Sequence, residues 1–136
     1  MPWVVDTCLV IDVAENDPQF GEGSAHLLDQ RRSAGLLVAP VSYIELAPLF
    51  NGVQTVQNEF LESTGINWTH SWTWPDTIVA HRAWRHYMMR RRRGRIDKRP
   101  IADVLIGAFA MRFDGLLTRD RKDFRSLYPD LRLEEP

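Results

Sequence analysis

The sequence predicts an α/β fold with a mainly parallel central sheet flanked by helices. Short apolar segments that suit buried strands alternate with longer segments of helical periodicity, as in β-α-β units. The chain has 136 residues, the size of one ordinary domain, and 44% of them are hydrophobic, enough for a substantial core. We therefore expect a single domain over residues 1–136.

The first half of the chain is predicted to contain two strands, each followed by helices. WVV at 3–5 is a short apolar strand, and TCLVIDVAEN turns to helix directly after Asp6. GLLVAP at 35–40 is the second strand. Apolar residues at helical spacing predict the remaining helices at 23–33, at 41–50 with Pro48 late in it, and at 53–63.

The second half continues this alternation. IADVLIGAFA has apolar residues on nearly every side, which predicts a helix that is buried almost all round. The expected elements are a strand-like stretch at 65–75, a helix from Asp76 to about Arg93, the helix at 101–110, a strand GLL at 115–117, a loop at 118–124 and an edge strand LRL at 131–133.

Asp103 is the one charged residue of IADVLIGAFA. An unpaired, ionised carboxylate inside such a helix costs several kcal/mol. The group must therefore be protonated, paired with a cation, hydrogen-bonded to backbone or bound to a metal ion. The helix alone does not decide among these four states.

Three more acids occupy comparable positions. Asp6 and Asp120 follow predicted strands, and Glu45 is the one charge in VSYIELAPLF. Pockets form beyond the carboxyl ends of parallel strands, so Asp6 and Asp120 are expected to meet there, within reach of Glu45. Taken singly, Asp6 also fits a helix cap, Glu45 a buried salt bridge and Asp120 a turn former.

Four carboxylates that converge without lysine or arginine repel one another, and their pKa values rise. A divalent cation removes this conflict, and carboxylate oxygens suit Mg²⁺ or Mn²⁺. One or two such ions can activate a water and stabilise the leaving oxygen of a phosphodiester. The pattern predicts a metal-dependent nuclease whose ligands are Asp6, Glu45, Asp103 and Asp120.

Other residue types narrow the choice of function. Cys8 is the single cysteine, which excludes an internal disulfide and a cysteine-based zinc site, and the four histidines lack HExxH spacing. The start carries no basic leader, and no stretch is long and apolar enough for a bilayer. We expect a cytoplasmic protein without membrane association.

The net charge of the chain is −1, but its basic residues are concentrated in one segment. RRRRGRIDKR at 90–99 holds seven basic residues and one acid. One interpretation is a solvated helix end whose arginines pair with surface acids. The other is contact with the phosphates of RNA through Arg91, Arg92, Arg93 and Arg95.

Four segments together resemble the PIN-domain nucleases. WVVDTCLVIDVAEND resembles the amino-terminal signature of that family, VSYIELA its second acidic motif, IADVLIGAFA its third and GLLTRDRKDF its fourth. Each motif is short, but their order and spacing cover most of the chain. In size and pattern the chain is similar to the VapC-type toxins of toxin–antitoxin pairs, which are Mg²⁺- or Mn²⁺-dependent ribonucleases inhibited by a VapB antitoxin.

The resemblance implies a PIN-like fold and an endoribonuclease that hydrolyses RNA with metal-activated water at Asp6, Glu45, Asp103 and Asp120. It also implies an RNA substrate, a VapB-like antitoxin and a homodimer. Asp123 matches a position at which the family often has an acid. The roles open to it are a metal ligand, a hydrogen-bond partner of a ligand and a cap for the following turn. Thr7 and Thr118 match small hydroxyl residues that orient ligands or water, with capping as the alternative.

Other functions remain to be compared with this one. A housekeeping RNA-processing nuclease with a PIN domain would carry the same acids as a toxin. A PIN module that binds RNA or a partner without cutting it would lack one or more of them, and none is missing. A phospho-accepting receiver domain would need an acidic pair after its first strand and a lysine after its last. The interior acids lie on predicted helices instead, and Lys122, which follows Asp120 within the loop, is not suitably placed.

Overall fold

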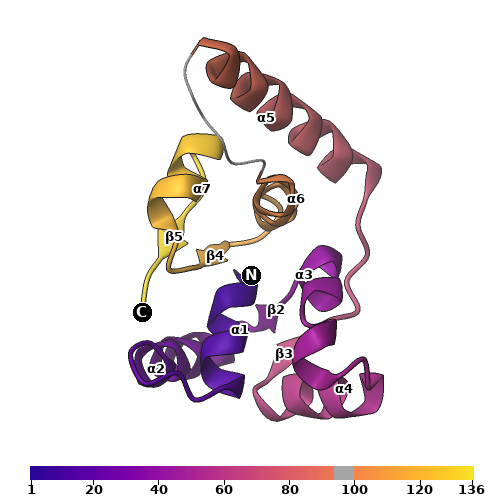
Figure 1. The fold of residues 1–136 in the computed structure, drawn as a ribbon, viewed down its shortest axis with the longest axis vertical. Coiled ribbons are helices and arrows are strands. Elements are labelled where there is room, and N and C mark those ends of the chain that lie inside the picture. The colour runs from indigo at the N-terminus through magenta and orange to yellow at the C-terminus, as the bar shows by residue number, and fades with distance from the viewer. Residues whose placement is uncertain (94–99) are drawn as a thin grey trace.

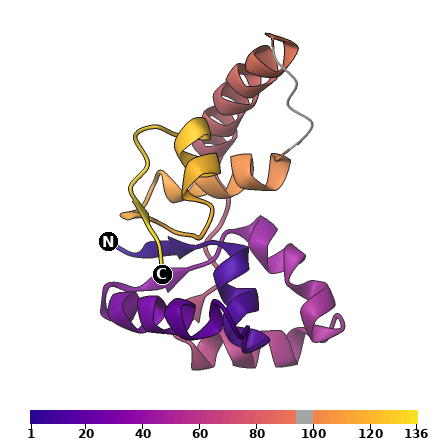
Figure 2. The same cartoon turned by 60° about the vertical axis from the view of Figure 1, so that its left-hand side comes forward.

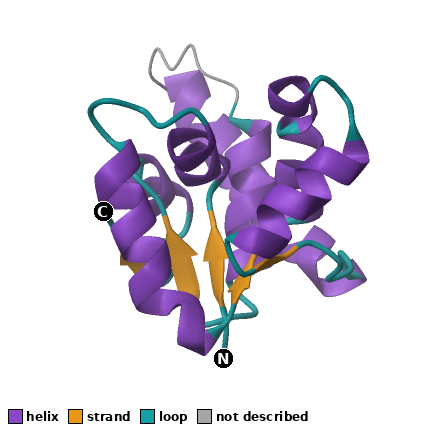
Figure 3. Ribbon diagram, turned by 90° about the horizontal axis from the view of Figure 1, so that it is seen from below, coloured by secondary structure: helices purple, strands orange, loops and turns teal. Residues whose placement is uncertain are grey.

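The computed structural model contains a parallel sheet with the strand order β3-β2-β1-β4-β5. It describes the backbone of residues 1–93 and 100–136 and the side chains of residues 1–90 and 100–136. Figure 3 shows the strands enclosed by helices. The predicted α/β fold class is therefore confirmed, including the parallel arrangement of the sheet.

The strands are two or three residues long, and their side chains alternate between the two faces of the sheet. Val4 packs into one hydrophobic cluster, while its neighbours Trp3 and Val5 pack into the other. Both faces are therefore buried, as is usual for parallel sheets. The strands are β1 (Trp3–Val5), β2 (Leu36–Leu37), β3 (Ile66–Asn67), β4 (Gly115–Leu117) and β5 (Leu133–Glu134).

Helices cover both faces of the sheet. The helices are α1 (Thr7–Ala14), α2 (Gly21–Arg31), α3 (Pro40–Glu45), α4 (Gln54–Ser63), α5 (Trp74–Arg93), α6 (Ile101–Ala110) and α7 (Arg121–Leu127). Short 3₁₀ helices follow α2 at Arg32–Ala34 and α3 at Ala47–Phe50. Helices α1, α2 and α4 pack on one face and α5, α6 and α7 on the other (Figures 1 and 2).

The structure differs from the sequence prediction at the loop expected over 118–124. Helix α7 begins at Arg121 and extends to Leu127. Its apolar residues Phe124 and Leu127 lie three positions apart and are both buried, so one face of the helix packs on the core. The charged residues that precede Phe124 conceal this short amphipathic pattern in the sequence.

Three other segments are shorter than predicted. The strand expected at 35–40 covers only Leu36–Leu37. The strand-like stretch at 65–75 forms a strand only at Ile66–Asn67, because the Asn67 side chain accepts the Thr69 N–H at 3.0 Å and turns the chain. The helix expected over 41–50 ends at Glu45 and continues as a 3₁₀ helix that contains Pro48. Proline cannot donate the hydrogen bond that an α-helix would need there.

Helix α6 is buried along its second half and more open at its start. Ile101 is 50% exposed, whereas every residue from Val104 to Ala110 except Leu105 is buried. At Gly107 an added Cβ would overlap the ring of Tyr128, and the Tyr128 hydroxyl donates a hydrogen bond to the carbonyl of Val104. This contact fixes the position of α6. The first turn of the helix, which contains Asp103, lies at the carboxyl edge of the sheet.

Within the described ranges, none of the helices combines the length and the apolar character that a membrane crossing requires.

Candidate metal centre

Asp103 and the four acids whose charges act on it form an acidic cluster, which comprises Asp6, Glu45, Asp103, Asp120 and Asp123. Asp6 is the buried member of this cluster. It follows β1 directly and is 4% exposed. Its Oδ2 accepts a hydrogen bond of 2.7 Å from the Thr118 hydroxyl, and the Cys8 sulfur lies 3.3 Å from the same oxygen. Burial raises the pKa of Asp6, and these hydrogen bonds oppose the rise. Asp6 precedes α1 without a side-chain capping bond, so the helix-cap interpretation does not explain it.

Asp103 lies in the first turn of α6 and is partly buried. Burial raises its pKa to about 7, and the negative charges of four other acids add to the rise; these are Asp6, Asp120, Asp123 and Glu45. Among the described side chains, Asp103 has neither a cationic partner nor a hydrogen bond. Of the four states that the sequence left open, protonation and metal binding remain.

Glu45 reaches the cluster from the end of α3. Its side chain is exposed, and its Oε1 accepts a hydrogen bond of 2.7 Å from the Thr7 hydroxyl. Thr7 Oγ1 also lies 2.9 Å from the hydroxyl oxygen of the buried Ser42. Among the described side chains, Glu45 is therefore held by the Thr7 hydroxyl and forms no salt bridge. Ser42 is a member of this group that the sequence analysis missed, because a serine within a helix carries no signal of its own.

Asp120 lies at the rim of the cluster, directly before α7. It is exposed, and its backbone N–H donates to Thr118 Oγ1 at 2.9 Å. Single ligand atoms of Asp6, Cys8 and Asp120 lie within 4.8 Å of one another. Asp123, one turn further on in α7, is partly buried, and its charge acts on Asp103. The acids of the cluster therefore gather from segments that lie far apart in the sequence.

The chemistry of the donors fits a hard cation. Carboxylate oxygens are the preferred ligands of Mg²⁺ and Mn²⁺. Burial, together with the charge of Asp6, raises the pKa of the Cys8 thiol to about 12, so the sulfur keeps its proton and donates to Asp6. Although Cys8 is close to both carboxylates, a protonated thiol is a poor ligand for a hard ion. Of the four predicted ligands, the structure brings ligand atoms of Asp6 and Asp120 close together, whereas Asp103 and Glu45 are linked to this group by the effect of their charges.

Two buried acids outside the cluster have cationic partners. Asp12 is 3% exposed and binds Arg119, with 2.7 Å between Oδ2 and Nε. Asp76 is 1% exposed and binds Arg112, with 2.7 Å between Oδ1 and Nε. Sequence analysis missed both pairs. Asp12 gave a usable signal, because it is a single charge within an apolar helix, as Asp103 is.

The predicted RNA contact falls largely beyond what the structure describes. Arg95 lies outside the described residues, and Arg91, Arg92 and Arg93 belong to the end of α5, where only the backbone is described. The phosphate contact therefore stays a prediction from charge alone.

Comparisons with known proteins agree with the fold at low sequence identity. No protein-family model matches the chain, and no curated protein matches it. Among solved structures, the crystal structure of VapBC2 from Rickettsia felis bound to a DNA fragment from their promoter contains a similar chain. The two chains align with a TM-score of 0.69 and 17% identity, over 99% of this chain and 98% of the other. The chain therefore has the PIN-like α/β fold that its sequence motifs predict.

Proposed function

We propose that this protein is a Mg²⁺- or Mn²⁺-dependent endoribonuclease and acts as the toxin of a VapBC-type toxin–antitoxin pair. The observation that carries the proposal is the environment of Asp103. This partly buried carboxylate has four acids as charged neighbours and no cationic partner among the described side chains. A site that is unstable without a cation is expected to bind one.

A divalent cation held by Asp6, Glu45, Asp103 and Asp120 would lower the pKa of a water and stabilise the leaving oxygen of an RNA phosphodiester. The buried Asp6 is oriented by the Thr118 hydroxyl, and Glu45 is oriented by Thr7. Asp103, with its raised pKa, would release its proton when the cation is bound. Glu45 and Asp120 are exposed, which leaves the rim of the site open to a polymeric substrate.

A VapB-like antitoxin is the protein partner in this proposal. The fold likeness to a chain of a VapBC2 structure supports it. An apolar groove beside the acidic cluster supports it as well, because exposed apolar surface is typical of protein interfaces. The groove includes Ile44, which is 70% exposed and adjacent to Glu45, and Leu105, which follows Asp103 by two positions. A homodimer belongs to the same proposal, and sedimentation of the purified chain measures it.

Cleavage of an RNA oligonucleotide by the purified protein tests the enzymatic part. We expect cleavage with Mn²⁺ or Mg²⁺, none in EDTA, and none by the Asp103→Asn variant. Asp130→Asn is the matched control, since Asp130 is an exposed acid outside the cluster, and it should cleave like the wild type. Binding of Mn²⁺ without any cleavage would favour the PIN module that does not cut RNA.

Expression in cells separates a toxin from a housekeeping enzyme. A toxin should arrest growth when it is expressed alone, and the product of a small adjacent gene should relieve the arrest. The Asp103→Asn variant should have no effect on growth. Cleavage in vitro without growth arrest would support the housekeeping role.

A further inference from the structure

Arg119 lies in sequence between Thr118, which donates to Asp6, and Asp120, but its guanidinium binds another acid. Nε donates to Asp12 Oδ2 at 2.7 Å, and Nη2 donates to Oδ1 at 3.0 Å. The Ser24 hydroxyl donates to Oδ2 of the same carboxylate at 2.9 Å. Both oxygens of Asp12 are thus hydrogen-bonded, and the two-bond geometry fixes the direction of the arginine side chain.

Helix α1 contacts the loop at residues 118–120, between β4 and α7, at successive points along its length. Asp6, at the start of the helix, accepts from the Thr118 hydroxyl. The backbone of Arg119 lies close enough to Cys8 to oppose the rise in the pKa of the thiol, and the side chain of Arg119 binds Asp12. Cys8 and Asp12 are four residues apart and therefore lie on one face of α1. The backbone and the side chain of Arg119 both lie along that face.

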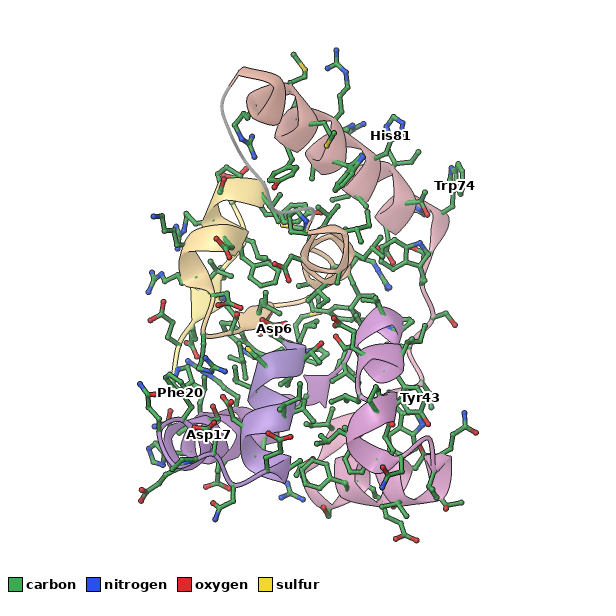
Figure 4. All side chains as sticks on the ribbon, viewed as in Figure 1. Asp6, Asp17, Phe20, Tyr43, Trp74 and His81 are labelled. Atoms are coloured by element: carbon green, nitrogen blue, oxygen red, sulfur yellow. The ribbon has the colours of Figure 1, made fainter. Side chains whose placement is uncertain are left out.

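The guanidinium is also held from its other side. It lies 4.0 Å from the centre of the Phe20 ring. Asp17 accepts hydrogen bonds from the N–H groups of Gln19 at 2.9 Å and Phe20 at 2.8 Å, which fixes the turn that carries this ring. Figure 4 shows Asp17 and Phe20 beside α2, away from Asp6 at the start of α1. The guanidinium is therefore held by Asp12 and Phe20 and forms no hydrogen bond with the acids of the cluster among the described side chains.

We propose that Asp12 and Arg119 form a positioning pair for the metal centre. The pair holds the loop so that Thr118 and Asp120 face Asp6, and it binds the guanidinium to Asp12, so that Asp120 feels the charge of Arg119 without forming an ion pair with it. The inference rests on the proposed function. Its consequence is that the pair sets the affinity of the acidic cluster for a divalent cation without contacting the cation.

The chain supplies a matched control pair. Arg112 binds Asp76 through two hydrogen bonds, of 2.7 Å from Nε and 2.9 Å from Nη2, and Asp76 is as buried as Asp12. Its guanidinium also lies against aromatic rings, 5.0 Å from the centre of Phe109. Arg112 follows the end of α6 opposite to Asp103. Loss of either arginine leaves a buried aspartate unpaired, but only Arg119 belongs to the loop of the cluster.

Arg119→Gln and Arg112→Gln are compared in the full-length protein. Both should lower the melting temperature of the metal-free protein to a similar extent, because each leaves one buried aspartate without its cation. Titration calorimetry with Mn²⁺ should give a dissociation constant about 10 to 100 times higher for Arg119→Gln and within about twofold of the wild type for Arg112→Gln. Hydrogen exchange of the Asp120 amide should accelerate only in Arg119→Gln.

Equal Mn²⁺ affinities and equal exchange rates in the two variants would overturn the positioning role and leave a purely structural ion pair. If Arg119→Gln does not fold, Arg119→Lys replaces it; lysine keeps the charge but not the two-bond geometry, so affinity should fall less. A wild type that binds no Mn²⁺ would overturn the proposed function. The exchange of the Asp120 amide would still decide whether the pair holds the loop.

Discussion

The Thr118 hydroxyl donates a hydrogen bond of 2.7 Å to Oδ2 of Asp6, 112 positions away in the sequence. The bond follows from the pairing of β1 with β4, in which Val5 lies opposite Leu117, so that the next residues of both strands meet. Strand pairing in the centre of the sheet therefore sets the orientation of the most buried carboxylate in the cluster.

Thr118→Val tests this orientation, because valine has nearly the same shape but no hydroxyl. The free energy of unfolding should fall by about 1–3 kcal/mol, since a buried acceptor loses its donor. Affinity for Mn²⁺ should fall about 10- to 100-fold. Chemical denaturation and titration calorimetry measure the two effects. Thr77→Val is the control, because it removes the 2.8 Å bond from Trp72 outside the cluster and should leave Mn²⁺ affinity unchanged.

Asp103→Asn should make the metal-free protein more stable and should abolish its stabilisation by Mn²⁺. The substitution removes a charge that four neighbouring acids repel. Thermal melts of the wild type and the variant, with and without Mn²⁺, measure both effects. A buried ion pair would give the opposite result, a loss of about 3–5 kcal/mol. That loss, together with a wild-type melting temperature that does not respond to Mn²⁺, would contradict the metal centre.

The stability of the metal-free wild type should fall as pH rises from about 4 to about 7. The Asp103 carboxyl has a pKa of 3.8 in a model compound and about 7 in the folded chain. Between these values the folded state holds a proton that the unfolded state has lost, so each rise in pH favours unfolding. Three pKa units correspond to at most about 4 kcal/mol, and the partial exposure of Asp103 lowers this figure. Denaturation at several pH values should give a flatter profile for Asp103→Asn.

The products of RNA cleavage should carry a 5′-phosphate and a 3′-hydroxyl. Attack by the neighbouring 2′-hydroxyl needs an acid and a base tuned near neutral pH, usually histidines, and leaves a cyclic phosphate. The four histidines of the chain are all exposed, and none is among the groups that act on Asp103. End-group analysis of a cleaved oligonucleotide decides the point. A 2′,3′-cyclic phosphate would contradict hydrolysis by water even if the fold and the cation site are as described.

Replacing Arg91, Arg92, Arg93 and Arg95 with glutamine should weaken RNA binding across sequences. For every phosphate that the variant no longer neutralises, the slope of log K against log salt should become shallower by about 0.7. Binding is measured in the Asp103→Asn background, so that the RNA stays intact. Mn²⁺ affinity of the otherwise wild-type protein should not change. An unaltered slope would assign the run to solvent or to a protein partner.

Much of the architecture follows from sequence because it depends on local pattern. WVV before Asp6 and GLL before Thr118 are apolar runs bounded by polar residues, and both are strands in the structure. The acids after them meet because parallel strands share one carboxyl edge. Helix α7 was missed because only Phe124 and Leu127 carry its periodicity, and two residues cannot be distinguished from chance.

Some partners of the acids were not predictable in the same way. The resemblance pointed to Thr7 and Thr118, but not to Ser42, which contacts Thr7 and whose position depends on how α3 lies against α1. Asp12 and Arg119 are 107 positions apart, so no local pattern links them. Sequence identified which charges were unusual, and tertiary packing decided which of them are neutralised by arginine.

The contact between Gly107 and Tyr128 has a consequence for sequence variation in this fold. The ring occupies the space that a side chain at 107 would fill, and its hydroxyl binds the backbone of the same helix at Val104. The two positions therefore cannot vary independently. A homologue with alanine or a larger residue at 107 should carry a smaller residue at 128, and this pairwise covariation would mark chains that keep the first turn of α6 in the same place.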